Sequence, residues 1–253
     1  MFIDFMLNNF EAKKDSTAII WKEKKYPYSW LLKKIDEFKT IFKNENIKEN
    51  SIVALRSDFN PESVACLLAL IDNGNIITPI SYAVKTIEEF YNIAEIEYVI
   101  EINDTSYEVT HRNTNVEHEI LKKLKEINHP GLILFSSGST GKSKAAVHDF
   151  LPLLDKFKVK RHTLKTITFL LFDHIGGVNT LLYILSNCGT IVALDDRSPE
   201  EVCRLIEKYE VELLPTSPTF IYMILISRAY EKYNISSLKM VTYGTEPMSE
   251  HIL

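Results

Sequence analysis

The sequence predicts an α/β fold in which helices cover both faces of layered, largely parallel β-sheets. Short apolar runs rich in β-branched residues alternate along the whole chain with segments whose apolar residues recur at helical spacing. Several of these helical segments open on a capping residue followed by proline, at Asn60, Ser198 and Ser217. Alternation of this kind is typical of parallel strands that are connected by helices.

The expected strands are short and apolar. They cover two strands around a charged turn within 17–28, then 51–55, 76–80, 98–102, 132–135, 166–172, 190–194, 211–214 and 238–242. The expected helices follow them, at 1–7, from about 29 to 42, 60–73, from 86, 117–127, 150–157, after 177, from 198 and from 217. Thr86 and Glu89 have the spacing of a capping box. Residues 103–115 are polar and without period, so they predict a surface loop.

Composition limits the classes of function. The chain has 253 residues, 45% of them hydrophobic and 25% charged, as is usual for a globular protein. Its net charge of −5 argues against a nucleic-acid partner. The three cysteines are widely spaced, which favours buried thiols in a reducing compartment. No apolar run is long enough to span a membrane and no signal peptide is evident, so we expect a cytoplasmic protein.

One stretch changes character abruptly and directs the functional interpretation. The apolar residues 132–135 are followed by six small residues and then by lysines. These are Ser136, Ser137, Gly138, Ser139, Thr140 and Gly141, with Lys142 and Lys144. Glycines let backbone N–H groups approach an anion, hydroxyls donate further hydrogen bonds, and lysine supplies positive charge. The stretch therefore predicts a phosphate-binding loop.

A nucleoside-triphosphatase loop is one interpretation of this stretch. Its pattern, G-x-x-x-x-G-K-[ST], fits Gly141, Lys142 and Ser143 but requires glycine where the chain has Ser136. The pattern also requires a helix after the lysine, and residues 144–148 fit a strand as well as a first helical turn. A kinase or ATPase of this kind is therefore the weaker alternative.

Residues 136–144 resemble much more closely the signature loop of the adenylate-forming ligases, which include acyl-CoA synthetases, peptide-synthetase adenylation domains and luciferases. The family pattern is roughly [ST]-[ST]-G-[ST]-T-G-x-P-K-G, from which the chain departs at Ser143 and Ala145. Three later segments, 172–177, 214–220 and 243–248, resemble further family motifs in the family's order. The resemblance covers most of the chain from 132 to 248 and implies the N-terminal large domain of such a ligase.

The resemblance also implies a reaction and roles for residues. A carboxylate would attack the α-phosphorus of ATP, forming an acyl-adenylate and releasing pyrophosphate. Residues 136–141 would hold the β- and γ-phosphates, with Thr140 as the main side-chain contact. Lys144 is the cation that matches the family's lysine, whereas Lys142 occupies a variable position in the same loop.

The acid and the adenine would be bound by residues further along the chain. His174 matches a pocket histidine near the substrate carboxylate, so with Lys144 it is a catalytic candidate. Asp173 would either bind an amino group of the substrate or fix the turn. Gly176 and Gly177 would let the next helix approach closely. The other candidates are Thr216 and Ser217 beside the substrate, and Gly244, Thr245, Glu246 and Pro247 beside adenine.

The last residues bear on how much of such a ligase is present. A helix pattern starts at Ser249 and stops within about one turn, so the sequence predicts a truncated, incomplete N-terminal AMP-binding domain. The resemblance divides it into two subdomains, approximately 1–55 plus 150–253, and 56–149. It implies ATP and Mg²⁺ as cofactors, with the magnesium motif beyond Leu253 and no metal ligand in this chain.

Two functional readings follow from the resemblance. In the first, the chain is part of an acyl-CoA synthetase-like ligase that acts on a carboxylic acid and passes it to CoA or a carrier-protein thiol, and the fragment alone is inactive. In the second, it is a truncated nucleotide-binding module without catalysis.

Overall fold

The computed structural model describes residues 2–137, 143–244 and 246–249, and within them the strands form two six-stranded sheets. In spatial order, sheet A contains β12 (Met240–Tyr243), β11 (Leu213–Thr216), β9 (Thr166–Ile167), β10 (Ile191–Val192), β1 (Thr17–Trp21) and β2 (Lys24–Pro27). Sheet B contains β6 (Ser106–His111), β5 (Tyr98–Asn103), β3 (Ile52–Arg56), β4 (Ile76–Ile80), β7 (Gly131–Ser137) and β8 (Ser143–Asp149). Pairing is parallel except at β1–β2, β5–β6 and β7–β8.

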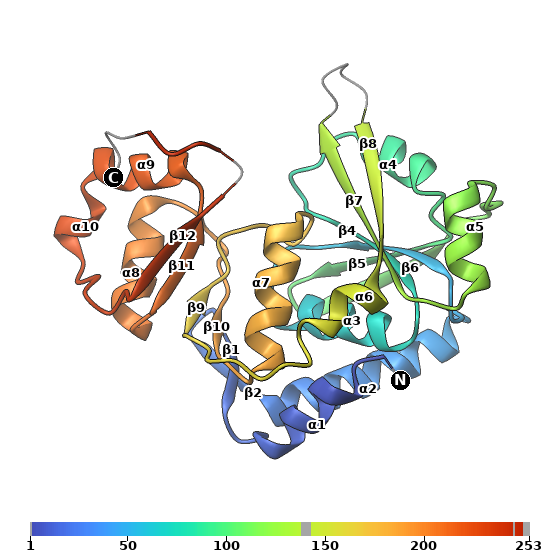
Figure 1. Cartoon of the computed structure of the whole chain (residues 1–253), viewed down its shortest axis with the longest axis horizontal. Helices are drawn as coiled ribbons and strands as arrows, with labels where there is room; N and C mark the ends of the chain where they lie inside the picture. The colour runs from blue at the N-terminus through green and yellow to red at the C-terminus, as the bar shows by residue number, and fades with distance from the viewer. Residues whose placement is uncertain (1, 138–142, 245, 250–253) are drawn as a thin grey trace.

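The helices pack against both faces of both sheets, which confirms the predicted α/β class (Figure 1). They are α1 (Asp4–Ala12), α2 (Tyr28–Asn44), α3 (Pro61–Asp72), α4 (Ile87–Ile93), α5 (Glu119–Glu126), α6 (Phe150–Asp155), α7 (Ile175–Ser186), α8 (Pro199–Tyr209), α9 (Pro218–Ser227) and α10 (Ala229–Lys232). None of the helices in the described ranges is long and apolar enough to cross a bilayer.

Alternation of side chains along the strands defines the layers. In β3, Ile52 and Ala54 join the cluster with α4 and α5, whereas Val53 and Leu55 join the cluster with α3 and α7. Sheet A likewise has α7 on one face and α8 and α9 on the other. Helix α7 therefore lies between the two sheets, as Figure 1 shows, and contributes to the same core as both.

The predicted helix starts are confirmed where a cap precedes proline. The Asn60 side chain accepts a hydrogen bond from the Ser63 N–H at 2.8 Å, and the Ser63 hydroxyl accepts one from the Asn60 N–H at 3.0 Å. Ser198 caps α8 and Ser217 caps α9 through hydrogen bonds to backbone N–H groups three residues further on. These local sequence signals therefore fix where the helices begin.

Several predictions about single strands, loops and caps are wrong. Residues 103–115 are not a loop, since β6 pairs antiparallel with β5 after a turn in which Asp104 has φ of 53°. This edge strand is mostly exposed and polar, so its composition hid it. The capping box is absent, since Thr86 makes no side-chain cap and the Glu89 carboxylate accepts a hydrogen bond from the Ser143 N–H at 3.3 Å. The predicted strands 166–172 and 190–194 are each paired over only two residues.

The two sheets also bear on the expected subdomains. β1, β2 and β9–β12 form sheet A, while β3–β8 form sheet B. β3, which ends at the expected boundary near residue 55, therefore lies wholly in sheet B. The division into 1–55 plus 150–253 and 56–149 stays a prediction, as does the helix expected from Ser249, most of which lies outside the described residues.

We predict that Tyr28→Phe destabilises the fold by about 1–3 kcal/mol. The Tyr28 hydroxyl is fully buried and donates a 2.6 Å hydrogen bond to the Gly189 carbonyl, so the substitution leaves a buried acceptor unpaired. Urea unfolding followed by circular dichroism measures the change. Tyr222→Phe, at a half-exposed ring, is the matched control and should change stability by less than about 0.5 kcal/mol. Equal effects of the two substitutions would contradict the prediction.

Thiol reactivity tests the predicted burial of the cysteines. Cys66 and Cys203 are buried, and burial raises the pKa of Cys203 to about 11 and that of Cys66 well above its usual value. Because the thiolate is the reactive form, both should resist iodoacetamide at pH 8, while the half-buried Cys188 reacts first. Peptide mass spectrometry over a time course gives the order of labelling. Labelling of Cys66 or Cys203 at the rate of Cys188 would show that the core is open.

Candidate functional site

A cavity of about 310 Å³ opens between sheet B and the segment that leads into α7. It is lined by Pro79, Val84, Thr86, Phe90, Phe135, Ser136, Ser143, Asp173 and His174. Ser136 belongs to the predicted phosphate loop and Ser143 follows it, whereas Asp173 and His174 belong to the predicted substrate segment. The fold therefore brings two motifs that are far apart in sequence to one cavity.

The predicted phosphate loop connects two antiparallel strands. β7 and β8 pair from Gly131 opposite Asp149 to Ser137 opposite Ser143. The loop residues Gly138, Ser139, Thr140, Gly141 and Lys142 lie outside the described residues. A nucleoside-triphosphatase loop leads into a helix, and here the residues after it form strand β8. The open question at 144–148 is thus settled in favour of a strand, and the triphosphatase alternative is wrong.

Lys144 stands beside the cavity but does not line it. It lies directly opposite Ser136 in the hairpin, and its side chain is exposed. Its neighbour Ala145 packs with Phe135 in the cluster beneath α4. Since successive side chains point to opposite faces of a strand, Lys144 lies on the face opposite to Ala145, which is the face of its cross-strand partner Ser136.

Asp173 and His174 form the polar wall of the cavity. One carboxylate oxygen of Asp173, Oδ2, accepts a hydrogen bond from the Ser81 N–H at 3.2 Å. The other, Oδ1, is buried without a hydrogen-bond partner among the described residues and lies 3.7 Å from His174 Nε2. The His174 side chain is 64% exposed. The imidazole is thus available to a ligand in the cavity, while the carboxylate is fixed by the backbone of sheet B.

His174 is also the N-cap residue of α7, and its side chain makes no capping hydrogen bond. The first N–H groups of a helix have no partner within the helix and carry partial positive charge. The cavity wall therefore combines a carboxylate with a helix start that favours negative charge. This combination suits a ligand that carries an anionic group and a hydrogen-bond donor.

Gly177 is required by the close approach of α7 to the segment before it. A Cβ added at Gly177 would lie 1.9 Å from the carbonyl oxygen of Leu171, a contact that no side chain tolerates. A Cβ at Gly176 would instead meet the end of the Leu170 side chain at 3.1 Å, which can move. The two glycines therefore have different roles: Gly177 sets the packing distance and Gly176 does not.

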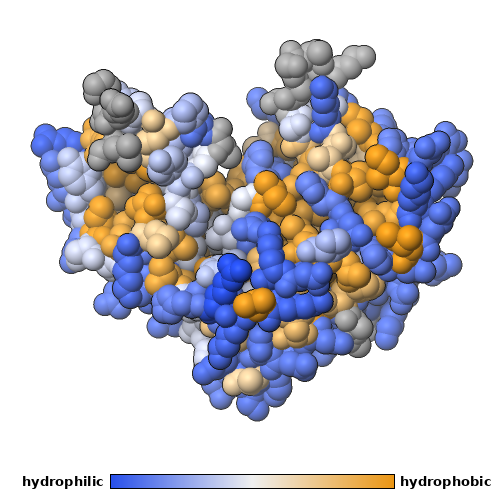
Figure 2. Space-filling model, viewed as in Figure 1, coloured by the Kyte–Doolittle hydropathy of each residue, from blue (hydrophilic) through white to orange (hydrophobic). Residues whose placement is uncertain are grey.

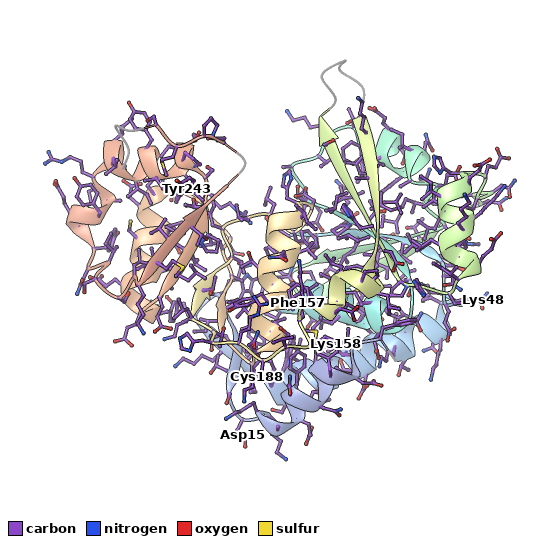
Figure 3. The ribbon with its side chains drawn as sticks, viewed as in Figure 1. Asp15, Lys48, Phe157, Lys158, Cys188 and Tyr243 are labelled. Carbon is purple, nitrogen blue, oxygen red and sulfur yellow. The ribbon has the colours of Figure 1, made fainter. Side chains whose placement is uncertain are left out.

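The remaining candidates lie outside this cavity, at the carboxyl ends of β11 and β12. These strands and α8–α10 form a separate lobe of the molecule, the C-terminal lobe (Figure 1). Tyr243, labelled in Figure 3, ends β12, and Gly244, Glu246 and Pro247 follow it with exposed side chains or backbone. The Glu246 carboxylate accepts hydrogen bonds from the N–H and hydroxyl of Thr219, at 3.3 and 2.5 Å. Thr245 lies outside the described residues.

Thr216 and Ser217 belong to the same edge. Thr216 is buried, and its hydroxyl has no hydrogen-bond partner among the described residues, while Ser217 caps α9. Figure 2 shows a hollow in the surface between the C-terminal lobe and the lobe formed by sheet B. The candidate residues thus lie in two groups, one in the cavity and one at the edge of sheet A.

Sequence reasoning missed several residues of the cavity. The rings of Phe90 and Phe135 stack at 3.9 Å and form its apolar wall, and Pro79 lines it from β4. Ser81, which directly follows β4, binds the lining residue Asp173 through its backbone N–H. Ligand sites of parallel sheets lie outside the carboxyl ends of the strands, which is a signal that could have identified Ser81. Phe90 lies on a helix and carries no such signal.

The described residues contain no cluster of metal-ligating side chains. No group of three or more histidine, cysteine, aspartate or glutamate side chains is placed to hold one within the ranges that the structure covers. Magnesium needs oxygen ligands, which it usually takes from one or two carboxylates together with substrate phosphates. The expectation that the magnesium motif lies beyond Leu253 stays a prediction.

Comparison with known proteins agrees with these features. A family model described as "AMP-binding enzyme" matches residues 7–253. The chain is 29% identical to 4-coumarate--CoA ligase-like 9 of Arabidopsis thaliana, over 49% of this chain and 24% of that protein. It is 22% identical to acetyl-coenzyme A synthetase of Salmonella typhi, over 95% of this chain and 47% of that protein. The chain therefore spans less than half the length of either relative.

A solved structure shares the fold. The luciferase-like enzyme of the nonluminescent mealworm Zophobas morio superposes with a TM-score of 0.79 at 17% identity, covering 99% of this chain and 67% of that one. At this identity the similarity bears on the fold alone.

We predict that Gly177→Ala destabilises the protein by about 1–3 kcal/mol, because the added methyl forces α7 away from residues 170–171. Urea unfolding measures the loss. Gly176→Ala is the matched control, in the same helical turn. It should be neutral or stabilising by up to about 1 kcal/mol, because alanine favours a helix and the Leu170 side chain can move. If both substitutions cost the same, the close approach at Gly177 does not limit the packing of α7.

Proposed function

The chain belongs to the AMP-binding enzyme family, and from this membership and the geometry of the cavity we propose that it supplies the nucleotide- and acid-binding part of an acyl-activating ligase. In the proposed reaction a carboxylate oxygen attacks the α-phosphorus of ATP. The bond from that phosphorus to the oxygen that bridges to the β-phosphorus breaks, and pyrophosphate leaves with that oxygen. The products are an acyl-adenylate and pyrophosphate.

The chemistry of this step explains the residue types. Two anions, the carboxylate and the triphosphate, must be brought together, so cations and oriented donors contribute more than a base does. In the proposal the loop 136–141 holds the β- and γ-phosphates, with Thr140 donating from its hydroxyl. Lys144, exposed beside Ser136, supplies positive charge to the departing pyrophosphate. Lys142 belongs to the same loop at a position we expect to be solvated.

The acid is proposed to bind against Asp173 and His174. His174 contacts the reacting carboxylate, and Gly177 places the start of α7 next to it, with Gly176 in the same turn. The buried, unpaired Oδ1 of Asp173 supports an acid that carries a donor, such as an amino group, within reach of the carboxyl group. For this reason the substrate panel below includes amino acids as well as fatty and aryl acids.

Adenine is proposed to bind along the segment after β12. Gly244, Thr245, Glu246 and Pro247 form one wall, and Thr216 and Ser217 lie at the neighbouring edge of the pocket. The hydrogen bonds from Thr219 to Glu246 support this role, because they hold the segment against the start of α9.

Transfer of the acyl group to CoA or to a carrier-protein thiol is a further part of the proposal. The similarity to 4-coumarate--CoA ligase-like 9 and to acetyl-coenzyme A synthetase supports a thiol acceptor. A magnesium ion would neutralise charge on the triphosphate when bound with ATP. The described residues do not form a site for it, so no step is assigned to it.

The observation that carries the proposal is that Ser136 and Ser143, on either side of the phosphate loop, line one cavity with Asp173 and His174. A phosphate site and an acid site must share one space if a carboxylate is to reach the α-phosphorus. The alternative is a nucleotide-binding module without catalysis, which needs only the phosphate loop and the adenine wall.

ATP–pyrophosphate exchange with fatty, aryl and amino acids tests the proposal. The chain is assayed beside a longer version that contains any coding sequence downstream of Leu253. We expect acid-dependent exchange from the longer protein, and the active acids then identify the substrate. ATP binding by both versions without exchange from either, for any acid, would overturn the ligase proposal in favour of the binding module.

Substitution of Lys144 tests the phosphate site separately. We expect Lys144→Ala to lower kcat/KM for ATP in the exchange assay by roughly 10–100-fold, which corresponds to the loss of one charge-assisted hydrogen bond. Lys25→Ala, at an exposed lysine of the edge strand β2, is the control and should leave the assay unchanged. An unchanged kcat/KM in Lys144→Ala would remove this lysine from the phosphate site.

A further inference from the structure

The segment that carries the proposed acid site has little backbone pairing of its own. Sheet pairing of β9 ends at Thr168, whose N–H donates to the Val192 carbonyl at 2.9 Å. From Phe169 to His174 the backbone hydrogen bonds within the described chain are local, such as that from the His174 N–H to the Leu171 carbonyl at 3.3 Å. The course of residues 169–174 is therefore decided by contacts with other parts of the fold.

Arg197 makes one of these contacts. Its Nε donates to the Phe169 carbonyl at 3.0 Å, and its two terminal nitrogens donate to the two carboxylate oxygens of Asp58 at 2.9 and 3.0 Å. The arginine side chain is 24% exposed and that of Asp58 is 33% exposed. Such a two-pronged pair fixes the plane of the guanidinium, and so directs the Nε–H at the Phe169 carbonyl.

Asp58 lies in the turn between β3 of sheet B and α3, and several hydrogen bonds hold it there. It directly follows Ser57, whose hydroxyl donates to the Ile102 carbonyl, and its own carbonyl accepts a hydrogen bond from the Ser63 hydroxyl at 2.6 Å. Its carboxylate also accepts the Phe59 N–H at 2.7 Å. Arg197 follows β10 of sheet A, so the pair links the carboxyl edges of the two sheets.

The same part of sheet B holds the other end of the segment. The ring of Phe59 lies 5.4 Å from that of Phe172, and both are at most 2% exposed. The Ser81 N–H binds the Asp173 carboxylate. Phe169 is thus held by Arg197 at one end of the segment, while Phe59 and Ser81 hold Phe172 and Asp173 at the other.

We propose that Arg197, oriented by Asp58, is a positioning residue that sets residues 169–174 relative to sheet B and thereby places Asp173 and His174 in the cavity. It does not touch the reacting groups, and it acts through the Phe169 carbonyl. The role in acid binding rests on the proposed function, whereas the role in holding the segment does not.

Hydrogen exchange with mass spectrometry tests the structural half without any activity. We expect Arg197→Ala to speed exchange at least tenfold in peptides that cover 169–174 and Ser81, and to leave peptides of β11 and β12 unchanged. Arg197→Lys should give an intermediate effect, because lysine keeps the positive charge but cannot form the two-pronged pair with Asp58. The matched control is Arg204→Ala, since Arg204 also makes a two-pronged pair with a carboxylate, that of Glu201 within α8. It should leave 169–174 unaffected.

A double substitution shows whether the two residues act as one unit. In the double variant Asp58→Ala/Arg197→Ala, hydrogen exchange in 169–174 should be no faster than in the faster of the two single variants. Additive effects, no change in 169–174, or faster exchange throughout sheet A would each overturn the proposal.

The pyrophosphate-exchange assay tests the functional half, in whichever version of the protein is active. We expect Arg197→Ala to raise KM for the acid at least tenfold while KM for ATP changes less than twofold, and Arg204→Ala to change neither. Equal changes in KM for the acid and KM for ATP would contradict the proposal that Arg197 positions the acid site. If the wild-type protein exchanges no label with any acid, the proposed function fails, and hydrogen exchange still decides whether Arg197 holds the segment.

Discussion

Burial of α7 between two sheets is the constraint on which the rest of the molecule depends. This helix is apolar on nearly all sides, so it needs cover from both faces, and sheets A and B provide it. Its first turn then lies beside the carboxyl ends of β4 and β7, where the cavity opens. Gly177 makes the arrangement possible, because any side chain there would collide with the Leu171 carbonyl.

The candidate site is assembled from sheet ends rather than from one element. Ser136 comes from β7, the Ser81 N–H from the end of β4, and Asp173 from the segment after β9. The hydrogen bonds of Asp58 with Arg197 link the carboxyl edges of the two sheets, and we propose that they hold these parts in register.

Two of the buried polar groups without a hydrogen-bond partner belong to the candidate residues. Asp173 Oδ1 and the Thr216 hydroxyl lack hydrogen-bond partners among the described residues, and such a group costs about 1–3 kcal/mol. Both lie at carboxyl edges, near residues that the family resemblance singled out. A donor on a ligand recovers this cost on binding, which is a physical reason for polar groups to be left unpaired at such edges.

Local patterns and short motifs read in order were enough to predict the α/β class, the helix starts at Asn60, Ser198 and Ser217, and the family. Motif order also pointed to Ser136, Asp173 and His174, though not to their shared cavity. Three features followed from the folded arrangement alone: β6 is a strand, residues 169–172 leave the sheet, and Arg197 binds Asp58 across 139 positions of sequence. These outcomes depend on which chain segments become neighbours, and neither composition nor periodicity records contacts at such separations.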